Sequence, residues 1–267
     1  MDIEQSRWAN TSNLGKAEVY FGVTPRTLVA LYDELLDDHE LLELANSQFV
    51  RGRSLGFTRG IFGKPNIDSI DWFGFERILV YVLVRHFRPR IVWETGVYYG
   101  GNSLFLLRAL QKNCYGQLSS AELPARDAHG DPKFPRHPWV RDSEDYDSDA
   151  LEPGFLVPPQ LRSDWDLRLG SSLDLLPTFP GPCDFYLHDS DHSMAFLTAE
   201  LELVKPILSP EAIVVVDDID WSNGFISFCS AYRLYPLLMT DNGKDELRVR
   251  LGLTALAHSH NQDGSFT

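Results

Sequence analysis

The sequence has few cysteines, few basic residues and no long apolar run. Three cysteines occur in 267 residues without a CxxC spacing, which argues against a disulfide framework or a zinc knuckle. The 24 lysines and arginines are outnumbered by 38 aspartates and glutamates, and a formal charge of −14 disfavours binding to nucleic acid or anionic membranes. The longest apolar run covers only 78–84, whereas a bilayer-spanning helix needs about 20 residues. Because the N-terminus also lacks a signal-peptide pattern, we expect a cytoplasmic protein.

Two nucleotide-binding motifs are also missing. No GxGxxG fingerprint occurs, which disfavours an NAD-dependent dehydrogenase, and no glycine-rich loop ends in GK[ST], as a P-loop would. The hydrophobic share of 43% and the charged share of 23% are nevertheless typical of a globular protein.

The first part of the chain differs in pattern from the rest. Residues 1–70 are polar, and the leucine spacing predicts a helix over 24–49, followed by a basic loop over 51–66. We expect this helical N-terminal extension, 1–70, to be a lid or a dimerisation element, so a homo-oligomer is left open. Residues 71–267 are expected to form one further domain.

Apolar strands alternate with helices from residue 71 onward. Strands are expected at 91–95, 117–123, 167–169, 184–188 and 212–216, and helices at 71–87, 103–112 and 194–208. This alternation predicts an α/β fold, doubly wound around a mostly parallel, Rossmann-like sheet. The segments 236–241 and 249–256 should close that sheet as an antiparallel hairpin. Between the second and third strands, an insertion loop, 124–166, is long enough to be functional.

A glycine-rich turn follows the first expected strand. In the segment WETGVYYGGNS (93–103), glycines let the backbone turn sharply between strand and helix and let a ligand approach closely. Glu122 ends the second strand, where an acid in doubly wound folds accepts hydrogen bonds from ribose hydroxyls. The alternatives are a tight structural turn and a solvated glutamate. Taken together, the two features favour a nucleotide-like cofactor.

Acidic residues follow the fourth and fifth expected strands. Asp189 comes after one strand, and Asp217 and Asp218 come after the next, so the carboxyl ends of parallel strands should bring the three carboxylates together. Such a group suits Mg²⁺ or a similar divalent cation, although helix capping is an alternative. His192 is placed to accept a proton from a substrate hydroxyl beside this group. His188 lies inside the strand and is expected to be packed.

These motifs resemble the class I S-adenosylmethionine-dependent methyltransferases, and within them the metal-dependent O-methyltransferases of the cephalosporin and macrolide-sugar tailoring type. The resemblance covers residues 72–256. Its first motif, ExGxxxGxS, is matched by Glu94, Gly96, Gly100 and Ser103. GSSLDLLP (170–177) resembles the family's GDSxxxLP element, with Ser171 where aspartate is commoner, and the second strand ends in AELP rather than the usual aspartate pattern.

The resemblance implies roles for particular residues. It assigns S-adenosyl-L-methionine to Glu94, Gly96, Gly100, Ser103, Glu122, Ser171 and Asp189. It assigns the divalent cation to Asp189, Asp217 and Asp218, and catalysis to Asp189 together with His192, which stands where the family has a lysine. We therefore expect a natural-product-tailoring enzyme that methylates a hydroxyl of a small molecule, with no nucleic-acid or membrane partner. A metal-independent methyltransferase and a non-catalytic cofactor-binding protein on the same fold remain alternatives.

Overall fold

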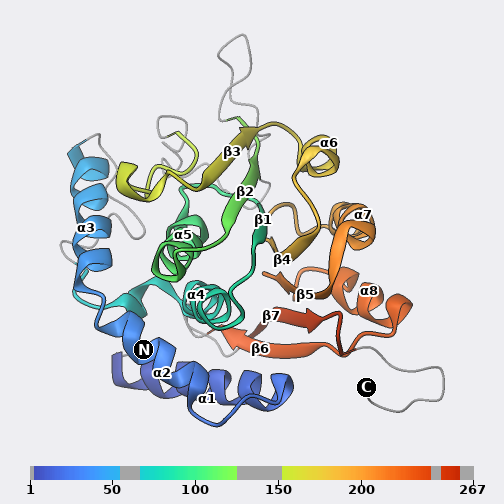
Figure 1. Ribbon diagram of the computed structural model, residues 1–267, viewed down its shortest axis with the longest axis horizontal. Coiled ribbons are helices and arrows are strands. Elements are labelled where there is room, and N and C mark those ends of the chain that lie inside the picture. Colours follow the sequence, from blue (N-terminus) through green and yellow to red (C-terminus); the bar gives the residue numbers. More distant parts are fainter. Residues whose placement is uncertain (1–2, 55–66, 125–151, 242–247, 259–267) are drawn as a thin grey trace.

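The computed structural model describes residues 3–54, 67–124, 152–241 and 248–258. Their strands form a seven-stranded sheet in the order β3-β2-β1-β4-β5-β7-β6 (Figure 1). The strands are β1 (Ile91–Thr95), β2 (Gln117–Glu122), β3 (Trp165–Leu169), β4 (Cys183–His188), β5 (Leu208–Val216), β6 (Leu237–Asp241) and β7 (Arg248–Ala255). Strands β1 to β5 pair in parallel, whereas β7 is antiparallel to both β5 and β6. The expected doubly wound, mostly parallel α/β sheet with antiparallel C-terminal strands is confirmed.

The central strands are apolar on both faces of the sheet. Along β5, Ile213 and Val215 belong to one buried cluster, whereas Val214 and Val216 belong to the other. This period of two with apolar side chains on both sides is typical of parallel strands covered by helices on each face. It explains why these strands could be recognised from composition.

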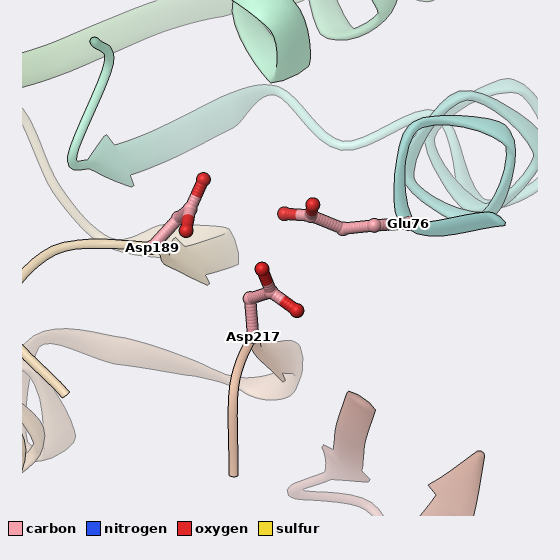
Figure 2. Close-up of side chains that lie close together, drawn as sticks. All are labelled: Glu76, Asp189 and Asp217. Carbon is pink, nitrogen blue, oxygen red and sulfur yellow. The ribbon is translucent and has the colours of Figure 1, made fainter. Parts of the chain in front are cut away.

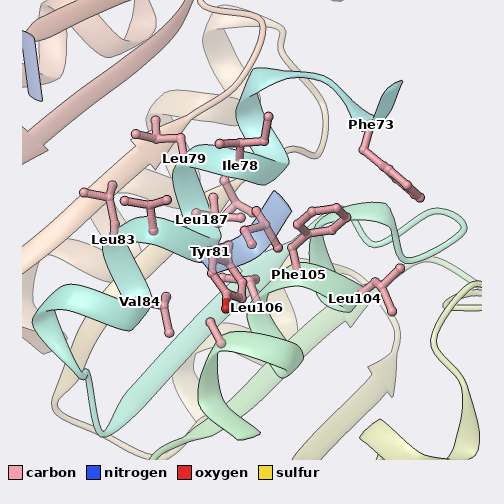
Figure 3. Packing of buried hydrophobic residues seen from close by; sticks show 14 of the residues in the cluster. Phe73, Ile78, Leu79, Tyr81, Leu83, Val84, Leu104, Phe105, Leu106 and Leu187 are labelled. Atoms are coloured by element: carbon pink, nitrogen blue, oxygen red, sulfur yellow. The ribbon is translucent and has the colours of Figure 1, made fainter. Parts of the chain in front are cut away.

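Helices cover the two faces in separate layers. Helices α4 (Phe75–Phe87) and α5 (Gly101–Asn113) lie on one face, and α7 (Met194–Val204) and α8 (Gly224–Tyr232) on the other (Figure 1). Side chains of α4, α5 and β4 fill the first layer (Figure 3). The helix expected from residue 71 is interrupted at Gly74, whose φ of 89° separates the short 3₁₀ helix η2 (Ile70–Phe73) from α4. Helix α8 was not expected.

Three further helices precede η2 in the chain: α1 (Ile3–Phe21), α2 (Thr27–Leu36) and α3 (His39–Ser54). The prediction of one continuous helix over 24–49 is wrong, because the chain breaks at Asp37 and Asp38. The Asp38 carboxylate accepts a hydrogen bond from the Leu41 N–H at 3.1 Å, as an N-terminal cap does, and two more from Arg108 of α5. A buried long-range partner therefore ends a helix that the apolar spacing would have continued.

Parts of two expected loops lie outside the described residues: 125–151 of the insertion and 55–66 of the basic loop. The described end of the insertion lies against the glycine turn, where the N–H groups of Gly154 and Leu156 donate to the carbonyls of Tyr98 and Tyr99, each at 2.8 Å.

No helix in the described ranges has both the length and the apolar character needed to cross a bilayer. The division at residue 70 stays a prediction.

Candidate functional site

The glycine turn lies between the ends of three neighbouring strands. The Gly96 N–H donates to the Ala121 carbonyl at 3.1 Å, and the Asp189 N–H donates to the Thr95 carbonyl at 2.8 Å. Gly96 has a φ of 82°, and a Cβ there would lie 1.9 Å from the Asp189 carbonyl oxygen. Only glycine fits this contact. Gly100, with a φ of 86°, then precedes α5.

Glu94 and Ser103 connect β1 to α5 inside the protein. Both residues are fully buried, and the Ser103 and Ser120 hydroxyls each donate to Glu94 Oε2 at 2.7 Å. Burial raises the pKa of Glu94 to about 7, although these two hydrogen bonds work to lower it. Glu94 thus lies beneath the turn.

Glu122 lies directly beside the turn. Its Oε2 accepts hydrogen bonds from the N–H groups of Val97 and Tyr98 at 2.6 Å, and its Oε1 accepts one from Leu123 at 2.8 Å. Burial raises the pKa of Glu122 against the effect of these bonds. Ser171 is held at the same edge, because the N–H of the preceding Gly170 donates to the Glu122 carbonyl at 2.8 Å.

Two of the three expected acidic residues meet at the carboxyl edge of the sheet. Carboxylate oxygens of Asp189 and Asp217 lie with one of Glu76 in a group whose members are within 4.8 Å of one another (Figure 2). Asp189 follows β4, Asp217 follows β5, and Glu76 comes from the first turn of α4. Burial, followed by the charges of Glu76 and Asp217, raises the pKa of Asp189 well above its usual range. Glu76 was not identified from the sequence, because nothing in its helical surroundings signals a ligand.

Asp218 does not join this group. Its φ of 50° turns the chain, and its carboxylate forms an ion pair with Arg250 of β7. The other Asp218 oxygen lies 3.7 Å from Nε2 of His192. Asp218, which was expected to be the third acid of the group, thus lies beside His192. Glu76 is the third acid of the group instead.

His192 lies between Asp189 and Asp218. Its Nε2 is 3.9 Å from Asp189 Oδ1, and its ring centroid is 5.9 Å from that of Trp221. Burial, together with the charges of His188 and Arg250, lowers the pKa of His192 to about 4. The imidazole is therefore neutral at pH 7, which is the form that accepts a proton.

A buried polar network lies beneath these residues. His188 is fully buried, as expected, and its Nδ1 lies 2.5 Å from Glu200 Oε2. The Glu200 carboxylate also accepts hydrogen bonds from Thr95, Ser172, Tyr186 and Ser190. Burial works to raise the pKa of Glu200, but the hydrogen bonds from His188, Ser172 and Tyr186 bring it below its usual range. Glu200, which sequence reasoning missed, ties β1, β4 and α6 (Ser172–Leu175) to α7.

The acidic group suits a hard cation in its chemistry. All three side chains offer oxygen, the ligand type that Mg²⁺ and Ca²⁺ prefer. Asn102, which is 3% exposed, adds an amide at the same place: its Nδ2 donates to Glu76 at 2.5 Å and to Asp189 at 2.9 Å. Its Oδ1 is buried without a hydrogen-bond partner in the described ranges. The residues present therefore fit a divalent cation.

A separate cleft of about 620 Å³ lies at the opposite, amino edge of the sheet. Its lining includes Pro89 and Arg90 before β1, Asp184 in β4 and Pro210 in β5. It contains none of the acidic residues described above. In a doubly wound sheet, ligands bind outside the carboxyl ends of the strands, so the functional site is assigned to that edge.

Comparison with known proteins indicates a methyltransferase-like domain. Residues 93–219 match the family model of a methyltransferase domain, whereas a search of curated proteins found no match. The solved structure of cofactor-bound Rv0187 from MTB is 15% identical, with a TM-score of 0.51, and the match covers 79% of this chain and 89% of that one. The O-methyltransferase from Bacillus cereus in complex with SAH is 14% identical, with the same TM-score and coverages of 80% and 90%. At these identities the two structures show a shared fold.

The matched range contains the central features of the carboxyl edge. It includes the glycine turn, Glu122, Asp189 and Asp217, and the strand order agrees with the fold. Residues 93–219 of this chain are therefore similar to a methyltransferase domain, and the chain shares its fold with the two solved structures.

Proposed function

We propose that the protein transfers the methyl group of S-adenosylmethionine to a hydroxyl group of a small molecule, with the assistance of a divalent cation. The observation that carries this proposal is the position of Asp189. Its backbone touches Gly96 of the glycine turn, and its carboxylate belongs to the acidic group. A cofactor over the turn and an acceptor beside the carboxylates would thus be neighbours.

The cofactor would be held by residues around the turn. Glu122 is the acid at the end of β2 that would accept hydrogen bonds from the ribose, and Ser171 lies at the same edge. Backbone N–H groups at the start of α5 would face the cofactor carboxylate. Glu94 and Ser103 would act indirectly, because both are buried beneath the turn.

The chemistry at the acceptor would be a proton transfer coupled to a displacement. His192, neutral at pH 7, would accept the hydroxyl proton, and the acceptor oxygen would form its bond to the methyl carbon while the carbon–sulfur bond breaks toward sulfur. A pKa of about 4 makes His192 a weak base. A bound divalent cation would lower the pKa of the acceptor hydroxyl and so compensate for that weakness.

A methyl-transfer assay tests the proposal. The protein is incubated with S-adenosylmethionine carrying a labelled methyl group and with catechol, phenol and sugar acceptors, in Mg²⁺ or in EDTA. We expect a labelled methyl ether whose rate of formation falls in EDTA and recovers with Mg²⁺. Transfer that is unchanged by EDTA would favour the metal-independent alternative, and cofactor binding without transfer to any acceptor would contradict the proposal.

A further inference from the structure

The third carboxylate of the acidic group comes from an element outside the matched methyltransferase range. Glu76 lies in α4, before residue 93, and is 1% exposed. Its position beside Asp189 and Asp217 is set by the packing of α4 against α5 and the sheet (Figure 2). Asp218 follows Asp217 directly but is paired with Arg250. Proximity in sequence therefore does not decide which acids converge.

Asn102 is an independent indication of a ligand. Its amide lies between Glu76 and Asp189, and its buried Oδ1 has no donor among the described residues. A buried acceptor without a donor costs about 1–3 kcal/mol. Rotation of the amide exchanges Nδ2 and Oδ1, so the same side chain can offer N–H groups to bare carboxylates or an oxygen to a cation.

Charge also favours a cation at this position. Arg77 Nη1 lies 3.3 Å from Glu76 Oε2. Burying like charges close together is costly unless a cation compensates them.

The spacing of the oxygens matches the size of divalent cations. Opposite ligands lie about 4.6–5.2 Å apart across Ca²⁺ and about 4.0–4.2 Å apart across Mg²⁺. One carboxylate oxygen from each of Glu76, Asp189 and Asp217 lies within 4.8 Å of the other two. Oxygens this close together can be ligands of one divalent cation.

We infer that Glu76, Asp189 and Asp217, with Asn102, form the divalent-cation site, and that Asp218 is not a ligand. This inference rests on the proposed function for its catalytic meaning but not for the binding itself. Asp218 instead lies between Arg250 and His192 and positions the histidine. The cation connects α4 to the ends of β4 and β5.

Calorimetric titration of the full-length chain with MgCl₂ and with CaCl₂, without cofactor or acceptor, tests the site. We expect one saturable site in the wild type, and at least tenfold weaker binding in Glu76→Gln. The matched control is Asp218→Asn, another acid-to-amide change, which should keep the wild-type affinity within about twofold. Asn102→Leu, which removes the amide oxygen, should also weaken binding.

The outcomes separate this inference from the proposed function. Loss of binding in Asp218→Asn with wild-type affinity in Glu76→Gln would overturn the inference, and so would the absence of cation binding in the wild type. If the wild type binds no cation but still transfers methyl groups, the methyltransferase activity stands and its dependence on a cation falls. If the cation binds at Glu76 but no methyl group is transferred, this inference stands and the proposed function falls. If Glu76→Gln fails to fold, as judged by circular dichroism, Glu76→Asp replaces it and should bind more weakly because its carboxylate is one methylene further back.

Discussion

Glu94 is a buried acid whose ionisation opposes folding. Burial raises its folded-state pKa from 4.5 to about 7, and its Oε1 has no hydrogen-bond partner in the described structure. The folded protein therefore binds a proton that the unfolded chain releases between these two values. Protonated Glu94 therefore leaves the folded protein most stable at low pH. The free energy of unfolding falls as the pH rises from about 4.5 through 7 and Glu94 loses its proton.

We predict that the free energy of unfolding increases as the pH falls from 8 to about 5, by roughly 2.5 kcal/mol from Glu94 alone. Glu94→Gln has no proton to bind, so this component should disappear from its pH profile. Urea unfolding of both proteins across the range measures the difference. Parallel pH profiles in the two proteins would show that Glu94 does not titrate there.

His192 is the residue to which we assign the proton transfer. We predict that His192→Ala lowers kcat by about 10²- to 10⁴-fold with little change in acceptor KM, because the histidine acts in the transition state. His258→Ala is the control, since His258 lines the cleft at the opposite edge and should keep wild-type turnover. Steady-state kinetics with an acceptor that the protein methylates measures kcat and KM for both variants. An unchanged kcat in His192→Ala would show that the histidine is not the base.

At the scale of elements, the turn after β1 depends on one close contact. A Cβ at Gly96 would collide with the backbone of Asp189, whereas one at Gly15 in α1 would meet nothing within 4 Å. We predict that Gly96→Ala destabilises the protein by about 1–3 kcal/mol or more and weakens cofactor binding. Gly15→Ala should be stabilising by up to about 1 kcal/mol, because alanine favours a helix. Equal effects on thermal unfolding would contradict this account of the turn.

The break between α2 and α3 depends on a buried ion pair. Arg108 and Asp38 are almost completely buried, and Lys112 lies 3.4 Å from the same carboxylate. Arg108→Ala would leave Asp38 with the Leu41 N–H and the partly exposed Lys112, so we predict a loss of about 3 kcal/mol in the free energy of unfolding. Arg168→Ala removes the exposed pair with Asp166 and should cost under about 1 kcal/mol. Similar losses in chemical denaturation would show that burial of the pair does not matter.

The elements that could be predicted are those whose signal is local. The strand 212–216 is apolar on both faces, and Asp217 follows directly after it, as Asp189 follows the buried strand 183–188. Two features could not be predicted: the break between α2 and α3 at Asp38, and the place of Glu76 in the acidic group. Each depends on a partner that is remote in sequence and is brought near by packing. Asp218 follows the same local pattern, but its carboxylate pairs with Arg250, which is remote in sequence.

At the scale of the whole molecule, the sheet separates two edges with different properties. The carboxyl edge carries the glycine turn, Glu122 and the acidic group, whereas the amino edge carries the cleft around Pro89 and Asp184. Some of the acidic residues behind the charge of −14 can also be assigned to this edge. Three of the acids converge at the inferred cation site, and Glu122 lies where a ribose would bind.

Binding of S-adenosylmethionine at the carboxyl edge underlies the whole proposed function. Isothermal titration calorimetry of the full-length protein with S-adenosylmethionine, S-adenosylhomocysteine and NAD⁺ tests this binding. We predict one saturable site per chain for the first two ligands, weakened by Glu122→Gln, and no heat of binding for NAD⁺. Binding of NAD⁺ without binding of S-adenosylmethionine would contradict this prediction.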